Sequence, residues 1–418
     1  MRFQTAVRRT ARRVHTRGAV VEVAFDEGRL VSTGSTQRIR EIEFELISGS
    51  TTAMLALVER WRKRFGLIYD PRSKSERGDR LAQGLPFPPV RKASLPKYSG
   101  DARATEVFGV VVDECIAQIT RNAVGLIEGD AAQRVEHVHQ LRVGIRRLRS
   151  ALRSFQGWAP PPPADLVEGL RALFATLGMA RESDVLDSGV ITELAKVGAP
   201  PLTLARGASG PDPVEAVRAA ATQRTFLAWI AWRAALAQES AVGAETHVAE
   251  PQVGEARPNG DAVPSEDDAG AVDGSLDEVQ ATQPVPDNAP TFHRNVARRL
   301  RRWHARIVVD WKAFDALDEA SLHALRKRIK RQRYAVEFFA PVLRRRKVER
   351  YLKALATIQE RMGELNDLFV ARAQYQPLVV SDPAAWFALG WLAARIAEAR
   401  ALAKPELGQL AKADPPTL

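Results

Sequence analysis

The spacing of apolar residues changes along the chain, from the alternation typical of β-strands to the period of α-helices. Between residues 19 and 47 the alternation predicts strands at 19–25, 30–32 and 39–47, with a turn at 26–29. Further on, the helical period predicts helices near 51–65, 105–128, 133–156, 164–179, 184–197, 213–238, 292–316, 319–340, 347–365, 367–376 and 383–402. We therefore expect a mainly α protein, preceded by a small antiparallel β or α+β unit.

The segment 138–155 has a pronounced two-faced pattern. At about 100° per residue, one sector of its helix is apolar and carries Leu141, Ile145, Leu148, Leu152 and Phe155. The opposite sector is basic and carries His139, Arg142, Arg146, Arg149 and Arg153. The same arrangement returns later, with an apolar side at Leu325, Ile329, Val336 and Phe339 and a basic side at His323, Arg326, Lys330 and Arg333. The chain therefore contains an internal repeat.

A glycine-centred motif follows each basic row at nearly the same distance. Gly178 lies 39 residues after His139, and Gly363 lies 40 residues after His323. With the changes in composition, the repeat divides the chain into a β unit at 1–83, a proline-rich linker at 84–104, a first helical half at 105–238, an acidic insertion at 239–290, a second helical half at 291–404 and a tail at 405–418.

Charge is distributed unevenly along the chain. The net charge is +11, but residues 239–290 hold twelve acidic residues against the single base Arg257, so the remainder sums to +22. This excess favours a polyanionic partner, although arginine-rich proteomes also produce such counts. We expect the insertion to be disordered, either as an ordinary long loop or as an acidic competitor that folds over the basic faces.

The remaining composition limits the class of protein. The single cysteine, Cys115, excludes an internal disulfide framework and a cysteine-based zinc site. The N-terminus lacks the apolar core of a secretory signal, and the longest apolar run, 384–394, is too short to span a membrane. We expect a cytoplasmic protein without membrane insertion.

The basic rows have the chemistry of an anion site. Steps of three and four residues place the cations along one side of a helix over roughly 15 Å, and arginine can offer its fork to two phosphate oxygens. The alternative is a solvated charged face. His139 and His323 could contact phosphate or make structural hydrogen bonds to a carboxylate. We expect supporting contacts or helix caps from Glu182, Asp184, Asn366 and Asp367. We assign no catalytic residue to the rows, because no paired acid and nucleophile accompanies them.

These two helices and their motifs, 177–185 and 362–367, resemble the two halves of a CHAD domain, the conserved-histidine α-helical domain, over about 105–402. The resemblance implies two pseudo-symmetric antiparallel four-helix bundles whose basic faces meet around a groove. It also implies binding of inorganic polyphosphate without a cofactor, and association with polyphosphate or storage granules. Departures from the family pattern are Glu182, where aspartate is usual, and Gln332, which interrupts the apolar face.

The β unit shows a second resemblance. Its strand Glu41-Ile42-Glu43-Phe44-Glu45-Leu46, with the runs 22–28 and 73–78, resembles the C-terminal half of a CYTH domain, the triphosphate tunnel fold. The resemblance implies a divalent metal, Mg²⁺ or Mn²⁺, with Glu41, Glu43 and Glu45 as the remnant of its site. The alternative is that these glutamates form an ordinary solvated face. The family's opening glutamate-x-glutamate-x-lysine strand has no counterpart, so the unit is either a remnant or preceded by further sequence.

Three functions follow from these patterns. Polyphosphate binding comes first, and metal-dependent triphosphate hydrolysis is the alternative if the missing strand exists upstream. Nucleic-acid binding is disfavoured, because the basic rows lack interleaved aromatic residues that stack on bases. Enzymatic activity is therefore expected only with the missing strand.

Overall fold

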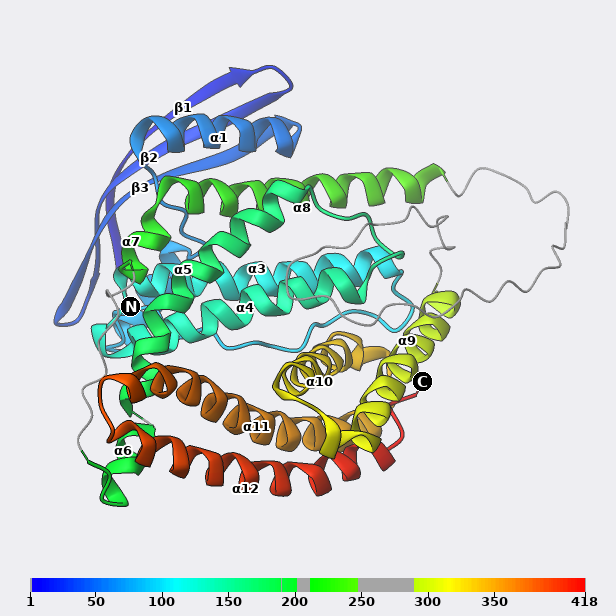
Figure 1. The fold of residues 1–418 in the computed structure, drawn as a ribbon. Helices are drawn as coiled ribbons and strands as arrows, with labels where there is room; N and C mark the ends of the chain where they lie inside the picture. Colours follow the sequence, from blue (N-terminus) through cyan, green and yellow to red (C-terminus); the bar gives the residue numbers. More distant parts are fainter. Residues whose placement is uncertain (1, 189, 201–210, 247–288, 418) are drawn as a thin grey trace, which may run out of the picture.

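The computed structural model describes residues 2–188, 190–200, 211–246 and 289–417, and it places a small sheet beside two groups of helices (Figure 1). The helices are α1 Thr51–Phe65, α2 Lys74–Ala82, α3 Ala104–Glu128, α4 Arg134–Ser154, α5 Ala164–Ser188, α6 Val190–Lys196, α7 Pro213–Arg218, α8 Ala220–Thr246, α9 Ala289–Lys312, α10 Glu319–Phe339, α11 Arg345–Tyr375 and α12 Ala385–Lys412. The predicted fold class, mainly α with an antiparallel sheet at the N-terminal end, is confirmed. Among the described helices, none has an apolar stretch that could cross a membrane.

The sheet contains three antiparallel strands in the order β1-β2-β3, with bounds Gln4–Thr16, Ala19–Ser32 and Ser35–Gly49. The sequence did not predict β1, because its arginines leave little apolar alternation. The predicted turn at 26–29 is wrong, since these residues lie inside β2 and the chain reverses at Gly18 and Gly34, whose φ angles are 96° and 74°. Asp26 lies inside the strand because Arg9 on β1 donates to its carboxylate at 2.7 Å.

Two helices complete the N-terminal unit. α1 covers the apolar face of the sheet, where Trp61 meets Phe44 edge to face with ring centroids 5.8 Å apart. The run 73–78, part of the resemblance to a CYTH domain, forms the start of α2, a helix that the sequence pattern did not predict. Ser73 accepts a hydrogen bond from the Glu76 amide at 3.1 Å, which satisfies one of the donors at the helix N-terminus.

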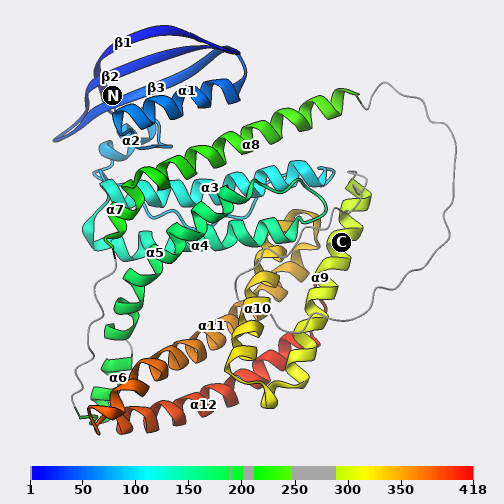
Figure 2. The ribbon, with the colours of Figure 1, turned by 45° about the horizontal axis from the view of Figure 1, so that its top comes forward.

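The remaining long helices form two groups of four, as predicted. α3, α4, α5 and α8 form the first half, and α9, α10, α11 and α12 form the second (Figures 1 and 2). In both views the first half lies between the sheet and the second half. α1 packs on α8, and α4 packs against α10, so the two basic helices of the repeat lie at the junction of the halves.

Several helix bounds differ from the prediction. The ends predicted at 179, 238 and 402 move to Ser188, Thr246 and Lys412, and the helix predicted at 213–238 is interrupted at Ala219, whose ψ of 135° is extended. The segments 347–365 and 367–376 form one helix, α11, because Leu365 and other buried residues continue on one side. The acidic insertion therefore begins within α8, and its residues 247–288 lie outside the described residues.

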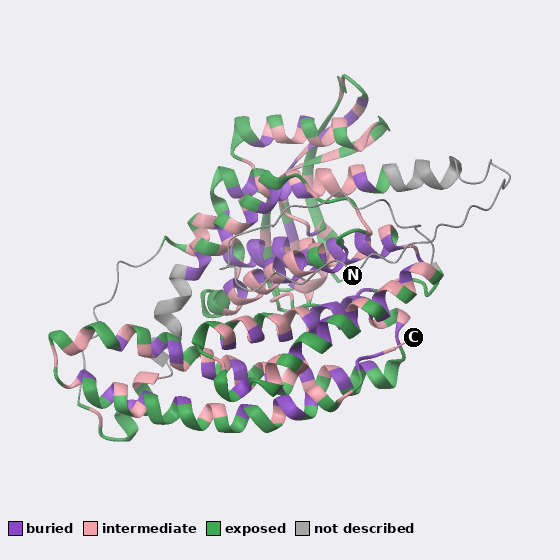
Figure 3. Cartoon of the chain, turned by 45° about the vertical axis from the view of Figure 1, so that its right-hand side comes forward, coloured by how far each residue is buried: buried purple, intermediate pink, exposed green. Residues whose placement is uncertain are grey.

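Aromatic residues fill the junction between the halves. Phe155 and Phe339 occupy equivalent places in the repeat, and their ring centroids are 5.2 Å apart. Phe292 of α9 stacks on Phe155 at 6.3 Å. All three side chains are buried, in line with the concentration of buried residues on the inner sides of the helices in Figure 3. The packing of these three rings thus fixes the distance between the two basic helices, α4 and α10.

The segment predicted as a linker, 84–104, is packed against both halves. The Asn122 side chain of α3 donates to the Arg91 carbonyl oxygen at 2.8 Å and accepts from the Arg91 amide at 3.2 Å. Further along, the Tyr98 hydroxyl donates to the Phe338 carbonyl oxygen of α10 at 2.8 Å. The segment therefore connects the two halves in addition to joining the sheet to them.

Candidate functional site

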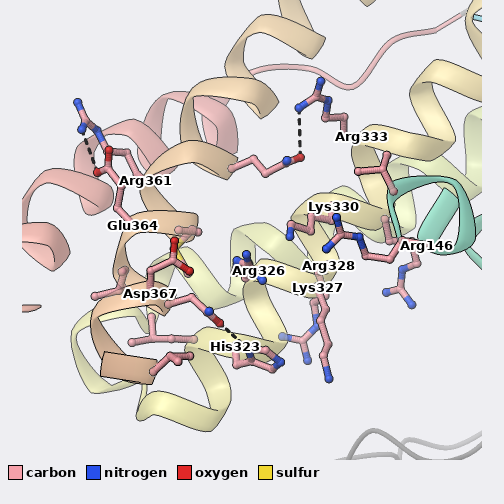
Figure 4. A pocket seen from close by; sticks show the side chains of 18 of the residues that line it. Arg146, His323, Arg326, Lys327, Arg328, Lys330, Arg333, Arg361, Glu364 and Asp367 are labelled. Carbon is pink, nitrogen blue, oxygen red and sulfur yellow. Dashed lines mark hydrogen bonds and ion pairs between the residues drawn. The ribbon is translucent and has the colours of Figure 1, made fainter. Parts of the chain in front are cut away.

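The two basic rows line one cavity of about 2020 Å³. It collects all nine predicted row residues, His139, Arg142, Arg146, Arg149, Arg153, His323, Arg326, Lys330 and Arg333. Figure 4 shows the second row following α10 from His323 to Arg333, with Arg146 approaching from α4 and Asp367 on α11 across the cavity. Both basic rows therefore face the same cavity.

The opposite faces of α4 and α10 anchor these rows. Leu141, Ile145 and Leu148 of α4 are at most 1% exposed, as are Leu325 and Ile329 of α10. Burial of this apolar stripe fixes the rotation of each helix and turns its basic sector toward the cavity. The predicted two-faced pattern therefore has its expected structural role.

Gly178 of the first motif makes room for an arginine of the row. The Arg142 guanidinium donates to the Phe174 carbonyl oxygen at 2.7 Å and lies 4.1 Å from the centroid of the Phe174 ring. A Cβ at position 178 would be 2.7 Å from the Arg142 guanidinium nitrogen. The glycine thus allows α5 to hold Arg142 against it. Gly363, its counterpart, has open space around it.

The histidines differ in their surroundings. His323 is exposed, and its Nδ1 lies 2.9 Å from the Asn366 side-chain oxygen. The partner is an amide instead of the expected carboxylate. Asn366 and Asp367 lie in the middle of α11, so the prediction that they cap a helix is wrong, although both line the cavity. His139 also lines the cavity.

Two predicted supporting residues, Glu182 and Asp184, belong to α5. Their side chains lie outside the described residues. Both are inside the helix, which continues to Ser188, so helix capping is also excluded for Asp184.

A buried ion pair joins the halves at the wall of the cavity. Arg147 of α4 pairs with Glu337 of α10, and their side chains are 3% and 12% exposed. Glu337 also accepts from Arg333 Nε at 3.0 Å, and Arg147 donates to the Ser94 carbonyl oxygen at 3.2 Å. Glu337 was not among the site residues predicted from the sequence.

Additional charged residues of the cavity were also missed. Its described lining contains fifteen lysine or arginine side chains and six carboxylates, an excess of nine positive charges. The cations outside the two basic helices are Lys92, Arg306, Arg361 and Arg395. They come from the linker, α9, α11 and α12, and only the arginine-rich sequence of α9 gave a signal. Such an excess along the lining of one cavity can bind a polyanion.

A second charged cluster lies on the sheet. Oxygens of Asp26, Glu41 and Glu43 lie within 4.8 Å of one another, a spacing that could suit a metal ion. However, Lys74 forms ion pairs with all three, at 2.7 Å to Asp26 and 2.5 Å to Glu41. Burial lowers the pKa of Lys74, but these ion pairs outweigh it and raise that pKa above its usual range.

Two arginines complete the neutralisation of this cluster. Arg9 pairs with Asp26 and Glu43, and Arg77 pairs with Glu41. The hydrogen bond from Arg9 lowers the pKa of Asp26 to about 2, against the effect of burial. Three cations thus face three carboxylates, and as arranged the cluster does not fit a divalent metal. Glu45, the third predicted ligand, is exposed and lies outside the group.

The fold and the cavity define a duplicated helical domain whose two halves enclose a cavity lined with an excess of positive charge. The CHAD domain family matches residues 110–376, so this chain belongs to the CHAD domain family. The crystal structure of the CHAD domain from the plant Ricinus communis is similar, with 28% sequence identity and a TM-score of 0.53 over 78% of this chain and 99% of that one. An inorganic triphosphatase of Haemophilus influenzae is 36% identical over 76 residues, which are 18% of this chain and only 22% of the relative.

Proposed function

We propose that the CHAD domain of this protein binds inorganic polyphosphate in the cavity between its halves. The observation that carries the proposal is the convergence of both basic rows, from segments far apart in the chain, on one space with an excess of nine positive charges. Each row extends roughly 15 Å along its helix, which suits a linear anion. In a cell, such binding would bring the protein to polyphosphate or storage granules.

The character of the cavity favours polyphosphate over nucleic acid. Phe174 lies beneath Arg142, and Tyr334 and Phe369 are each 8% exposed. Trp391 is partly exposed but lies 5.8 Å from the Arg395 guanidinium, so these rings offer little face to a base. Base stacking contributes about 1–3 kcal/mol per base in proteins that bind single strands. A ligand that consists of phosphate alone needs only the cations.

We expect the protein to bind long-chain polyphosphate far more tightly than single- or double-stranded DNA of equal charge. At about 0.15 M salt, isothermal titration calorimetry should give at least a tenfold difference in Kd, and the polyphosphate affinity should fall steeply as salt rises. Equal Kd values for the two polymers would show that the cavity responds only to charge and would refute the proposal.

Triphosphate hydrolysis is the second candidate, supported by the triphosphatase relative and by the carboxylates of the sheet. Because Lys74 and two arginines already neutralise these carboxylates, we expect no phosphate release from tripolyphosphate with Mg²⁺ or Mn²⁺ present. A malachite-green assay of the wild type and of Glu41→Gln decides this. Metal-dependent release that Glu41→Gln abolishes would establish hydrolysis at the sheet.

A further inference from the structure

The first two helices of each half, α3 and α4 against α9 and α10, correspond with an offset of 184 residues, which is the distance from His139 to His323. The offset also matches the end of α3 at Glu128 with the end of α9 at Lys312. Because the halves repeat both sequence and helix order, a contact in one half predicts a contact between the matching residues of the other.

Arg147 is the buried arginine of the first half. It pairs with Glu337 across the junction, and its guanidinium lies 5.2 Å from the Phe338 ring centroid. With 3% of the side chain exposed, its charge has little contact with water. The Glu337 carboxylate therefore offsets a charge that would otherwise destabilise the fold.

Arg331 is the matching arginine of the second half, but the residue that matches Glu337 is Arg153. The guanidinium of Arg331 lies 4.7 Å from a ring centroid of Trp303. Its Nε is buried and has no hydrogen-bond partner among the described residues. At the position where the first half has the Glu337 carboxylate, the second half has the Arg153 guanidinium.

The surroundings of Arg331 add further positive charge. Arg306 on α9 matches Asn122 on α3, so a charged side chain again replaces a neutral one. Burial, and then the charges of Arg153 and Arg306, lower the pKa of Arg331 to about 10. The sequence of α9 contains one carboxylate, Asp310, and an arginine of α10 already engages it at 2.6 Å. The Arg331 guanidinium therefore lacks the neighbouring carboxylate that Arg147 has in the first half.

We propose that Arg153, Arg306 and Arg331 hold one phosphate group, which takes the role that the Glu337 carboxylate has in the other half. All three arginines line the cavity. One guanidinium group can donate two parallel hydrogen bonds to phosphate oxygens. A tetrahedral phosphate can accept hydrogen bonds from several arginines at once. The inference rests on the proposed function for the chain that carries this group, but the same chemistry accepts free orthophosphate.

Restoring the symmetric carboxylate by Arg153→Glu tests the site. In phosphate-free buffer, the introduced carboxylate should pair with Arg331 and raise Tm by about 2–4 °C. Orthophosphate or pyrophosphate should stabilise the wild type, and this added stabilisation should disappear in the variant. The affinity for long-chain polyphosphate should fall about tenfold, because one strong contact is lost.

Arg60→Glu is the matched control, since Arg60 is exposed on α1, does not line the cavity and undergoes the same charge change. It should leave Tm and the orthophosphate response unchanged. If Arg153→Glu fails to raise Tm and retains the wild-type response to both phosphates and polyphosphate, the site does not exist. Stabilisation by polyphosphate alone, lost in Arg153→Glu, would support the site and identify the chain as the source of the phosphate group.

The two proposals fail separately. Wild-type polyphosphate binding with equal behaviour of Arg153→Glu and Arg60→Glu would reject only this site. A wild type that does not bind polyphosphate, but whose stabilisation by orthophosphate depends on Arg153, would reject only the proposed function.

Discussion

Replacing Arg146 and Lys330 together by alanine should weaken long-chain polyphosphate binding about 100-fold. The two residues occupy matching places on α4 and α10, and both line the cavity. Within the described part of the chain, no hydrogen bond or ion pair engages the Arg146 guanidinium, and its Nε is buried. A charge-assisted hydrogen bond contributes about 1.5–3 kcal/mol, so losing one from each half gives a change of this size.

The stability of this double variant should be equal to that of the wild type or higher. Like charges three or four residues apart destabilise a helix by a few tenths of a kcal/mol per pair, and both substitutions remove such charges. Calorimetric titration gives the affinity, and thermal unfolding without ligand gives the stability. A folded double variant with unimpaired binding would place the ligand elsewhere.

A control for net charge is available on α1. Arg60 and Arg64 are exposed on a helix that packs beside α8, and neither lines the cavity. Replacing both by alanine changes the charge by the same amount and should alter the polyphosphate Kd less than threefold. A loss comparable to that of the cavity variant would mean that overall charge, and not the two rows, determines affinity.

Glu337→Gln should have the second large effect, a loss of thermal stability. This change leaves Arg147 buried without a carboxylate, and breaking a buried pair costs about 3 kcal/mol or more. We expect Tm to fall by about 6 °C. Because one negative charge leaves the cavity wall, the affinity for polyphosphate should be unchanged or higher.

Glu364→Gln is the control for this loss of stability. Glu364 lines the same cavity but pairs at 3.2 Å with an arginine that is 36% exposed, and such surface pairs contribute about 0–1 kcal/mol. Thermal unfolding should therefore show a shift of at most about 2 °C. If Glu337→Gln unfolds at the wild-type temperature, the Arg147 pair does not stabilise the junction.

The helical repeat could be predicted from the sequence because a buried helix face must repeat apolar residues at a fixed period. That period predicted α4 and α10, and it placed the row residues on one side of each helix. Helix ends were less accurate. The break predicted between residues 365 and 367 is absent, because Met362, Leu365 and Phe369 continue the buried side of α11. The strand β1 was missed because an arginine-rich edge strand buries too little to show a pattern.

Partners far apart in the chain could not be predicted. Glu337 belongs to the site only because α4 and α10 cross, and the separation of 190 residues from Arg147 carries no sequence signal. Lys74 likewise reaches the sheet carboxylates from α2, a helix that the sequence pattern did not predict. The amide partner of His323 depends on α11 being one continuous helix.

The packed segment between the sheet and α3 changes where the helical domain begins. Ser94 accepts from Arg147, Lys92 lines the cavity and Tyr98 hydrogen-bonds to α10, so this segment forms part of the wall. A helical fragment that starts at residue 105 would lack one side of the cavity and a clamp across both halves. In evolution, another N-terminal unit fused at residue 105 in place of the sheet would alter the cavity. A fusion point before Arg91 would preserve it.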